Sequence, residues 1–354
     1  MNFRAGRPAL PTDAATEGAP IRSARRLCFF AHYHPTGVVA DYVLHYLAEL
    51  RKAGFATVVA STTTFAEGEA EKLRSACDDL ILRQNQGLDF GSWIDCWRKW
   101  SPIEAELLLL CNDSVYGPID DLTDCIDRLC STPADFYGLV GSHELRYHVQ
   151  SWFVLLRPAA YRSSAFEGLM SNPVPVDLSK FEIIQRYEVG MTAALREQGL
   201  QGHCLYEPSH DAYISRMMPF NASHLLWKEL VTEFGIPFIK VDLLRDNPLF
   251  VENIDGWSEI VAGSRPQLIS SISADVEARS RVAGRRSERK RGVGRALRLI
   301  YQRWVRRCLV RDLRYLRSGS SVALRLNLLY FAVGRFAGHT AKKFAQLLGL
   351  ATKV

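Results

Sequence analysis

The amino-acid sequence predicts an α/β protein with a mostly parallel, Rossmann-like sheet flanked by helices, followed by a basic helical tail. Apolar segments of strand length alternate with segments of helical period up to about residue 258. Four leucines, 107–110, lead into Asn-Asp-Ser, and such a short apolar run before polar and turn residues is typical of a strand buried on both faces. Basic residues accumulate after residue 279 and indicate a separate tail.

The predicted elements follow the order of β-α-β units. The first strand begins at Arg26, and the helix over 38–54 has apolar residues at helical spacing and ends at Gly54. Further strands are predicted at 55–61, 80–85, 107–111, 135–141, 151–158 and 203–208, with further helices at 67–79, 91–100, 121–130 and 183–200. Strands joined through helices predict parallel pairing with right-handed crossovers.

The composition divides the chain into four parts. Residues 1–24 are rich in Pro, Ala and Gly and are expected to be a disordered leader and not a signal peptide. Residues 25–258 form the predicted α/β domain, 259–292 read as a polar, basic linker, and 293–354 as an amphipathic helical tail. No apolar run reaches the roughly 18 residues that a membrane-spanning helix needs.

The cysteines indicate a reducing compartment. The chain has 8 cysteines and neither a C-x-x-C pair nor a zinc-like cluster. Several lie inside apolar runs, where a reduced thiol packs as a small hydrophobic group. This pattern favours the cytosol over a secreted, disulfide-bonded protein.

The net charge of +6 conceals a strong asymmetry. Residues 279–354 contain 20 Lys/Arg and 2 acidic residues (net +18), which leaves 24 basic and 36 acidic residues (net −12) in 1–278. With Leu297, Trp304 and Leu309 on one stripe, the tail is expected to attach peripherally to the cytoplasmic face of the membrane. The alternative is a helical pair packed on the domain or on a partner. Nucleic acid is not expected, since no recognised binding motif accompanies the charge.

Two motifs place polar groups at the carboxyl ends of predicted strands, where open α/β sheets bind ligands. In RQNQGLDFGSW, Arg83 to Trp93, Asn85 and Asp89 offer amide and carboxylate partners for a nucleotide, and Gly87 permits close backbone approach. A turn with a helix N-cap is the simpler interpretation. In the second motif Asp113 stands where a divalent cation bridging a diphosphate is held, or it caps the loop.

Two later motifs supply further polar groups. His148, Gln150 and Ser151 precede an apolar strand and are candidates to contact a sugar or an acceptor, although a lone histidine is more often structural. Glu188 is expected to open a helix, where the dipole favours negative charge and a carboxylate can act as general base. An ordinary first-turn charge is the alternative for Glu188.

The order of these motifs resembles the rhamnan synthesis protein F family of polysaccharide glycosyltransferases. The motifs are N-x-G-x-D-F-G-x-W, N-D-S-x-x-G-P, H-x-Q-S-[aromatic]-F and Y-E-x-G-x-[ST]-x-x-L-x-x-x-G, followed by "PF-[IL]-K" and "L-R-x-N-P" over roughly residues 26–250. The layout is also similar to inverting transferases of the GT-A fold. The resemblance implies nucleotide-sugar contacts from Arg83, Asn85, Gly87, Asp89, Asn112 and Asp113.

The resemblance further implies a function and its cofactor. It implies an inverting transfer of a sugar, rhamnose from dTDP by family, to a hydroxyl of a lipid-linked surface polysaccharide of the O-antigen or lipopolysaccharide type. Glu188 is then the base, and Asp113 binds Mg²⁺ or Mn²⁺. The Asp-x-Asp of the similar GT-A transferases is Asn112-Asp113-Ser114 here, so Arg83 or His148 are alternative sources of positive charge. The same departure supports the rival hypothesis, a non-catalytic module that docks other glycan enzymes.

Overall fold

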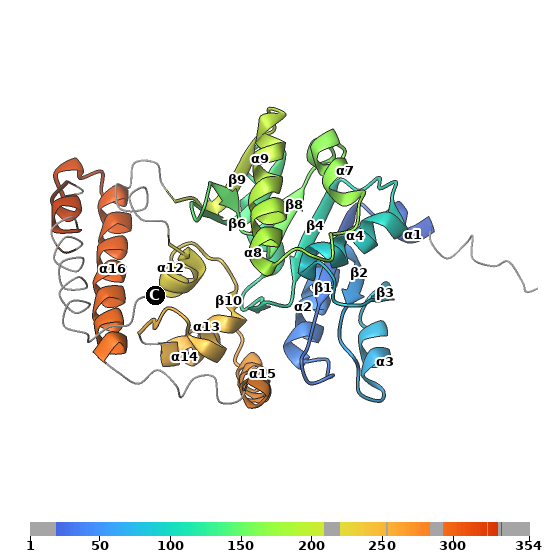
Figure 1. Cartoon of the computed structure of the whole chain (residues 1–354), viewed down its shortest axis with the longest axis horizontal. Helices are drawn as coiled ribbons and strands as arrows, with labels where there is room; N and C mark the ends of the chain where they lie inside the picture. Colours follow the sequence, from blue (N-terminus) through green and yellow to red (C-terminus); the bar gives the residue numbers. More distant parts are fainter. Residues whose placement is uncertain are drawn as a thin grey trace, which may run out of the picture.

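The computed structural model describes residues 19–208, 220–252, 254–283, 293–323, 325–331 and 334. Its centre is a sheet with the strand order β3-β2-β1-β4-β8-β6-β7, in which β9 also pairs with β6 (Figure 1). A separate two-stranded sheet joins β10 to β5. The strands are β1 Arg26–His32, β2 Phe55–Ser61, β3 Asp79–Leu82, β4 Leu107–Asn112, β5 Val115–Tyr116, β6 Phe136–Ser142, β7 His148–Val149, β8 Phe153–Leu156, β9 Gly202–Tyr206 and β10 Ile239–Lys240.

The predicted α/β sheet flanked by helices is confirmed, although its second half is mixed. Strands β3, β2, β1 and β4 are parallel, and Arg26 on β1 pairs with Phe55 on β2 and Leu107 on β4. Helices α2 (Asp41–Lys52), α3 (Glu69–Arg74) and α4 (Leu88–Trp100) connect them. Strand β8 runs antiparallel to both β4 and β6. The short links on either side of β7 can join antiparallel strands, whereas parallel strands need a longer crossover connection.

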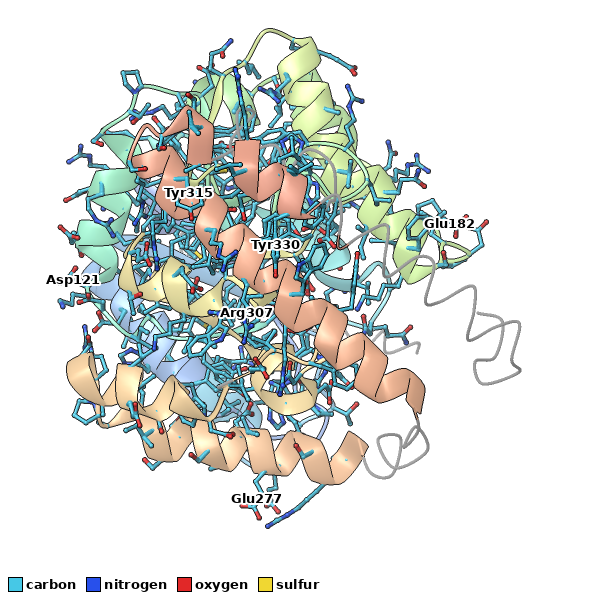
Figure 2. All side chains as sticks on the ribbon, turned by 90° about the vertical axis from the view of Figure 1, so that its left-hand side faces the viewer. Asp121, Glu182, Glu277, Arg307, Tyr315 and Tyr330 are labelled. Atoms are coloured by element: carbon cyan, nitrogen blue, oxygen red, sulfur yellow. The ribbon has the colours of Figure 1, made fainter. Side chains whose placement is uncertain are left out.

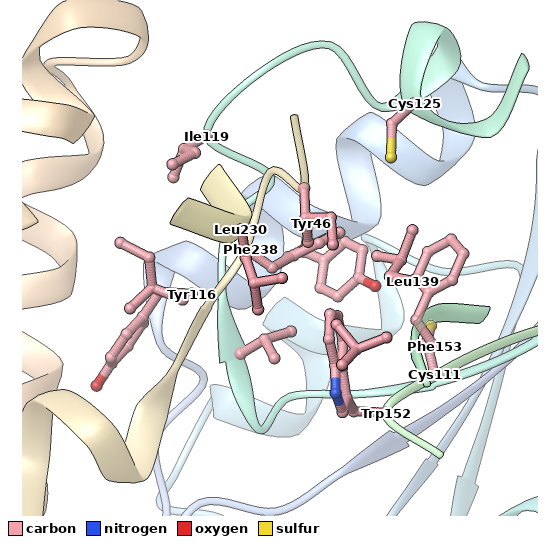
Figure 3. Close-up of a cluster of buried hydrophobic side chains, with 14 of the residues drawn as sticks. Tyr46, Cys111, Tyr116, Ile119, Cys125, Leu139, Trp152, Phe153, Leu230 and Phe238 are labelled. Atoms are coloured by element: carbon pink, nitrogen blue, oxygen red, sulfur yellow. The ribbon is translucent and has the colours of Figure 1, made fainter. Parts of the chain in front are cut away.

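The leucine run is explained by the two cores that the sheet separates. Leu109 belongs to the core under α2 and α5 (Leu122–Cys130), part of which Figure 3 shows around Tyr46 and Phe238. Leu108 and Leu110 belong to the other core. That second core lies under α4, α6 (Pro158–Tyr161), α7 (Ser164–Met170) and α9 (Gly190–Glu197). Both faces of β4 are therefore apolar, as a central strand requires.

The segment predicted to be a linker is largely helical and packed on the domain. Helices α14 (Trp257–Ser264) and α15 (Leu268–Ala283) cover most of 259–292, and Val261, Leu268 and Ile272 are buried in the core. The linker prediction rested on the polar composition of this segment. Several charged residues of the segment are turned inward and form ion pairs. The core also receives α11 (Ala222–Leu225), α12 (Trp227–Thr232) and α13 (Val241–Asp246), with η2 (Ile254–Gly256) before α14.

The apolar stripe of the predicted tail also packs on the protein. Helix α16 spans Val293–Arg317, and its Val305, Cys308 and Leu309 are buried. Arg306 donates a hydrogen bond of 2.8 Å to Glu229 on α12. Figure 2 looks onto this helix from outside. The packed arrangement, which was the alternative to membrane insertion, is thus what the structure shows for this stripe.

The remaining parts of the predicted domain division lie partly outside the described residues. Residues 1–18 of the predicted leader are outside them, and Ala19–Arg22 form the short helix α1. Residues 335–354 of the predicted tail and the side chain of Leu297 are outside them as well.

Gly117, in the turn after β5, offers a test of the fold. It has φ +139°, and a Cβ there would lie 2.4 Å from the Pro237 carbonyl oxygen beside β10. We expect Gly117→Ala to lower the free energy of unfolding by about 1–3 kcal/mol, measured by urea denaturation. Gly168→Ala, in a helix where the new methyl meets nothing within 4 Å, is the control and is expected to be neutral or stabilising. Equal stability of the two variants would contradict this account of the turn.

Candidate functional site

The first two predicted motifs meet at the carboxyl edge of the sheet. Asn112 ends β4, and its Nδ2 donates a hydrogen bond of 2.7 Å to Oδ2 of Asp89 in the first turn of α4. Asn112 Oδ1 in turn accepts hydrogen bonds from the backbone N–H (3.1 Å) and Oγ (2.6 Å) of Ser114. The Asn112 amide therefore links the two motifs by donating a hydrogen bond to Asp89. An ionised aspartate at position 112 could only accept hydrogen bonds.

Asp113 is buried and faces an arginine from the far end of the chain. Its Oδ2 lies 3.6 Å from Arg279 Nη2 and accepts a 3.1 Å hydrogen bond from the Tyr33 backbone N–H. Burial raises the pKa of Asp113 to about 7, while the Arg279 guanidinium opposes the rise. The predicted metal-binding carboxylate thus already has a cationic partner.

Arg279 is itself held by α15 and its neighbours. Its Nε donates a 2.8 Å hydrogen bond to Asp275 one turn earlier, and Asp275 also contacts His34 Nε2 and Tyr116 Oη, both at 2.7 Å. Sequence reasoning missed this pair because the segment was read as a linker. The Asp-x-x-x-Arg spacing of an (i, i+4) ion pair was the available signal.

Glu188 lies inside a helix and does not open one, so the prediction of a first-turn carboxylate is wrong. The helix begins at α8 (Lys180–Ile183) with a Ser179 capping box, and a π-helical turn, η1 (Ile184–Val189), then carries Glu188 before α9. Glu188 Oε1 accepts a 2.8 Å hydrogen bond from the Ser151 backbone N–H. A hydrogen bond to a strand end, and not a helix dipole, fixes this carboxylate. Single π-turns of this kind are frequent at functional sites.

Asp89 is linked electrostatically to both Glu188 and Asp113. Burial raises the pKa of Asp89, and Glu188 adds to the rise. Asp89 in turn contributes to the raised pKa of Asp113. Residues distant along the chain are therefore brought within electrostatic range at one edge of the sheet.

Lys240 is a site residue that the sequence analysis noted only as part of "PF-[IL]-K". Pairing of β10 with β5 puts Lys240 opposite Val115, and its Nζ donates a 2.9 Å hydrogen bond to Ser114 Oγ. Burial lowers its pKa, whereas the carboxylates of Glu188 and Asp89 oppose the fall. A lysine ammonium thus lies among the acidic groups of the site.

A groove of about 330 Å³ lies beside the Asn85–Gly87 loop. It is lined by this loop and by Pro175 and Lys180 from the segment that leads into α8. Gly87 has φ +79°, and a Cβ there would lie 2.5 Å from the Val174 side chain, so only glycine permits this close approach. Asn85 is exposed at the groove.

The other predicted residues are engaged within the protein. Arg83 pairs with Asp95 at 2.6 Å and donates to the Gln86 carbonyl at 2.7 Å, so it braces the loop. His148 Nδ1 is 2.8 Å from the Arg146 carbonyl oxygen.

Gln150 and Ser151 also have internal roles. Gln150 Oε1 accepts hydrogen bonds from Trp152 Nε1 (2.9 Å) and from Ser223 Oγ. Ser151 contributes its backbone N–H to Glu188. The H-x-Q-S segment therefore shapes the wall beside Glu188.

The described residues do not fit the predicted Mg²⁺ or Mn²⁺ site. Within them no group of three or more His, Cys, Asp or Glu side chains is arranged to hold a metal ion. Asp113 faces Arg279, and the neighbouring ligand position is the Asn112 amide, already bonded to Ser114 and Asp89. Divalent cations prefer several carboxylate and carbonyl oxygens as ligands, and this arrangement does not bring such oxygens together at one point.

The fold and site define an α/β protein with polar groups gathered at the carboxyl edge of the parallel half of its sheet, where open α/β sheets bind ligands. The family model described as Rhamnan synthesis protein F matches residues 57–256, more than half of the chain. The chain therefore belongs to the rhamnan synthesis protein F family, which connects it with polysaccharide synthesis.

Two curated proteins are similar to part of this chain at 26–28% sequence identity. The protein y4gN of Sinorhizobium fredii is 28% identical over 203 residues, which cover 55% of this chain and 52% of y4gN. The virulence protein VirA of Vibrio anguillarum is 26% identical, covering 54% of this chain and 70% of VirA. The chain thus spans about half the length of y4gN.

Solved structures with similarity include S. aureus TarS 1-349, at 12% identity and a TM-score of 0.33, covering 87% of this chain and 92% of that one. A 4-diphosphocytidyl-2C-methyl-D-erythritol synthase aligns at 12% identity and a TM-score of 0.29, covering 55% and 97%.

The histidine at the end of β1 gives the site a testable pH dependence. His32 is buried against Ser61 Oγ (2.9 Å), and burial lowers its pKa to about 3. A lowered histidine pKa contributes stability that is present above about pH 6.5 and is lost as the pH falls toward 3, by about 1.4 kcal/mol per pH unit. We expect acidification from pH 7 to pH 5 to destabilise the wild type more than His32→Asn, measured by urea unfolding at each pH. Parallel losses in both proteins would contradict this role of His32.

Proposed function

We propose that this protein transfers a sugar from a nucleoside diphosphate donor to a hydroxyl of a growing surface polysaccharide, with rhamnose from dTDP-rhamnose as the donor sugar. The observation that carries the proposal is the hydrogen-bonded set of Asp89, Asn112, Ser114 and Lys240 at the end of β4, in which Asp89 directly follows the loop that lines the groove at Asn85. Membership of the rhamnan synthesis protein F family supports a polysaccharide as the product. A lipid-linked acceptor of the O-antigen type is part of the same proposal.

In this mechanism each residue has a separate task. The groove at Asn85 and Gly87 binds the nucleoside. Asp89 with Asn112 accepts hydrogen bonds from the nucleoside hydroxyls and so orients them. Lys240 meets the diphosphate, and Glu188 removes the proton from the acceptor hydroxyl.

The transfer itself is a single in-line displacement. As Glu188 takes the proton, the acceptor oxygen bonds to the anomeric carbon, and the bond from that carbon to the diphosphate oxygen breaks. The nucleoside diphosphate leaves with both electrons of the broken bond, and the sugar configuration inverts. The transition state has oxocarbenium character, and Lys240 offsets the charge that develops on the leaving group.

The role of Glu188 is tested by an isosteric change. A nucleotide-sugar panel in a thermal-shift assay first selects the donor, since a ligand that binds only the folded state raises its melting temperature. We expect Glu188→Gln to keep that shift and to lose at least about a hundredfold in release of nucleoside diphosphate, because a positioned base contributes about 10²–10⁴-fold.

Glu182→Gln is the matched control. Glu182 is an exposed carboxylate near the start of the same helix, where it forms the capping box with Ser179 (Figure 2). It is expected to keep full turnover. Unchanged turnover in Glu188→Gln would remove Glu188 as the base. If no nucleotide sugar shifts the melting temperature, the rival hypothesis of a non-catalytic docking module gains over the transferase.

We also propose peripheral attachment to the cytoplasmic face of the membrane, on a different surface from the one that the sequence indicated. Arg303, Arg307, Arg311 and Arg314 recur at helical spacing on α16 and are exposed. In the following segment Val322, Leu326 and Leu329 are 68%, 62% and 61% exposed. Among the described helices, none combines the length and apolar character needed to cross a bilayer.

We expect the double variant Arg307→Gln, Arg314→Gln to bind anionic vesicles about thirtyfold more weakly in a flotation assay. Each basic residue near an anionic surface contributes roughly 1 kcal/mol, so two account for that factor. Arg51→Gln with Arg98→Gln, two exposed arginines on the body, serves as the control and should leave binding unchanged. Equal flotation with neutral vesicles would refute the proposal.

A further inference from the structure

A buried arginine lies at the position where a donor-site cation would be expected. Arg279 is 7% exposed, with Asp113 at 3.6 Å and Asp275 at 2.8 Å. Its Nη2 also donates a 3.0 Å hydrogen bond to Tyr42 Oη, which in turn donates to the Asp113 carbonyl at 2.8 Å. The guanidinium therefore fastens both the side chain and the backbone of the residue after β4.

Arg279 is shared between two carboxylates, since its Nε bonds to Asp275 at 2.8 Å and its Nη2 lies 3.6 Å from Asp113. Asp275, its other carboxylate partner, also has His34 at 2.7 Å and the Tyr116 hydroxyl at 2.7 Å. Asp113 has the Tyr33 N–H and Arg279 on the same oxygen, Oδ2. An uncompensated carboxylate at this place would repel an incoming diphosphate, and Arg279 neutralises it.

A second fixed cation, Lys240, is held at the residue that follows Asp113. Lys240 Nζ is 2.9 Å from Ser114 Oγ, one residue past Asp113, and it is partly exposed. The backbone N–H of Val241 also bonds to the Ser114 carbonyl at 2.9 Å, which ties the strand that bears Lys240 to the Asp113 turn. The two cations are thus held by one short stretch of chain.

We propose that Lys240 is the binding residue for the donor diphosphate and that Arg279, as a positioning residue, neutralises Asp113, so that binding requires no divalent cation. This inference rests on the proposed function, because it assigns the charge recognition of the same site. It replaces the metal expected from the sequence with two side chains that the fold brings together.

The test measures binding of inorganic pyrophosphate, UDP and dTDP by calorimetry, each in excess EDTA and in excess Mg²⁺. In the wild type we expect the dissociation constants in the two conditions to agree within about twofold. In EDTA, Lys240→Gln and Arg279→Gln should weaken pyrophosphate binding by about tenfold or more, and Arg279→Lys, which keeps the charge, should weaken it less. Circular dichroism melting confirms that each variant is folded.

Arg281→Gln is the matched control, since Arg281 is exposed on the same helix and pairs with Glu277 at 2.5 Å. Wild-type pyrophosphate binding that is absent in EDTA and restored by Mg²⁺ would overturn the inference, as would equal affinities of Lys240→Gln and Arg281→Gln. Lys240→Gln keeps the inference testable if Arg279→Gln does not fold. The nucleotide-sugar panel is judged separately: pyrophosphate bound without metal but no nucleotide sugar bound would refute the transferase and leave the anion site standing.

Discussion

The buried pair between Asp113 and Arg279 is the interaction on which the rest of this site depends. An ionised carboxylate at the end of a central strand loses its hydration, and only a close cation and hydrogen bonds offset that cost. Removing one partner of such a buried pair typically costs about 3–5 kcal/mol, because the other charge is left alone. Helix α15, which carries Arg279, is therefore required at the carboxyl edge of the sheet.

This requirement explains the organisation of the C-terminal region. Helix α15 buries Leu268 and Ile272 in the core, and its inward face brings Asp275 and Arg279 to α2, to β5 and to the turn after β4. Helix α16 closes the same side through Val305, Cys308 and Leu309. A segment that looks like an accessory tail thus becomes part of the body that shapes the candidate site.

The family relationship and the geometry support one picture at different levels. Membership of the rhamnan synthesis protein F family connects the chain with polysaccharide synthesis. The geometry adds a carboxylate on a π-helical turn, Glu188, fixed by the Ser151 N–H, and an ammonium, Lys240, fixed by Ser114. In the proposed transfer these two groups carry the proton and the leaving charge, and the amide of Asn112 joins their surroundings to Asp89.

The sequence by itself determined the alternation of strands and helices, the central position of the leucine strand, and the order of the motifs at the sheet edge. These are local properties, since strand and helix periods and turn residues are written in neighbouring positions. It also predicted that Asp89, Asp113 and Glu188 share one site, because carboxyl ends of parallel strands meet.

Only the tertiary structure decided which charges face one another. Arg279 and Lys240 reach the site through packing of α15 and pairing of β10, and no local pattern records a contact between segments so far apart. For the same reason the polar segment before the tail was read as a linker. Hydrophilic composition does not distinguish a solvated charge from one that is buried against its partner.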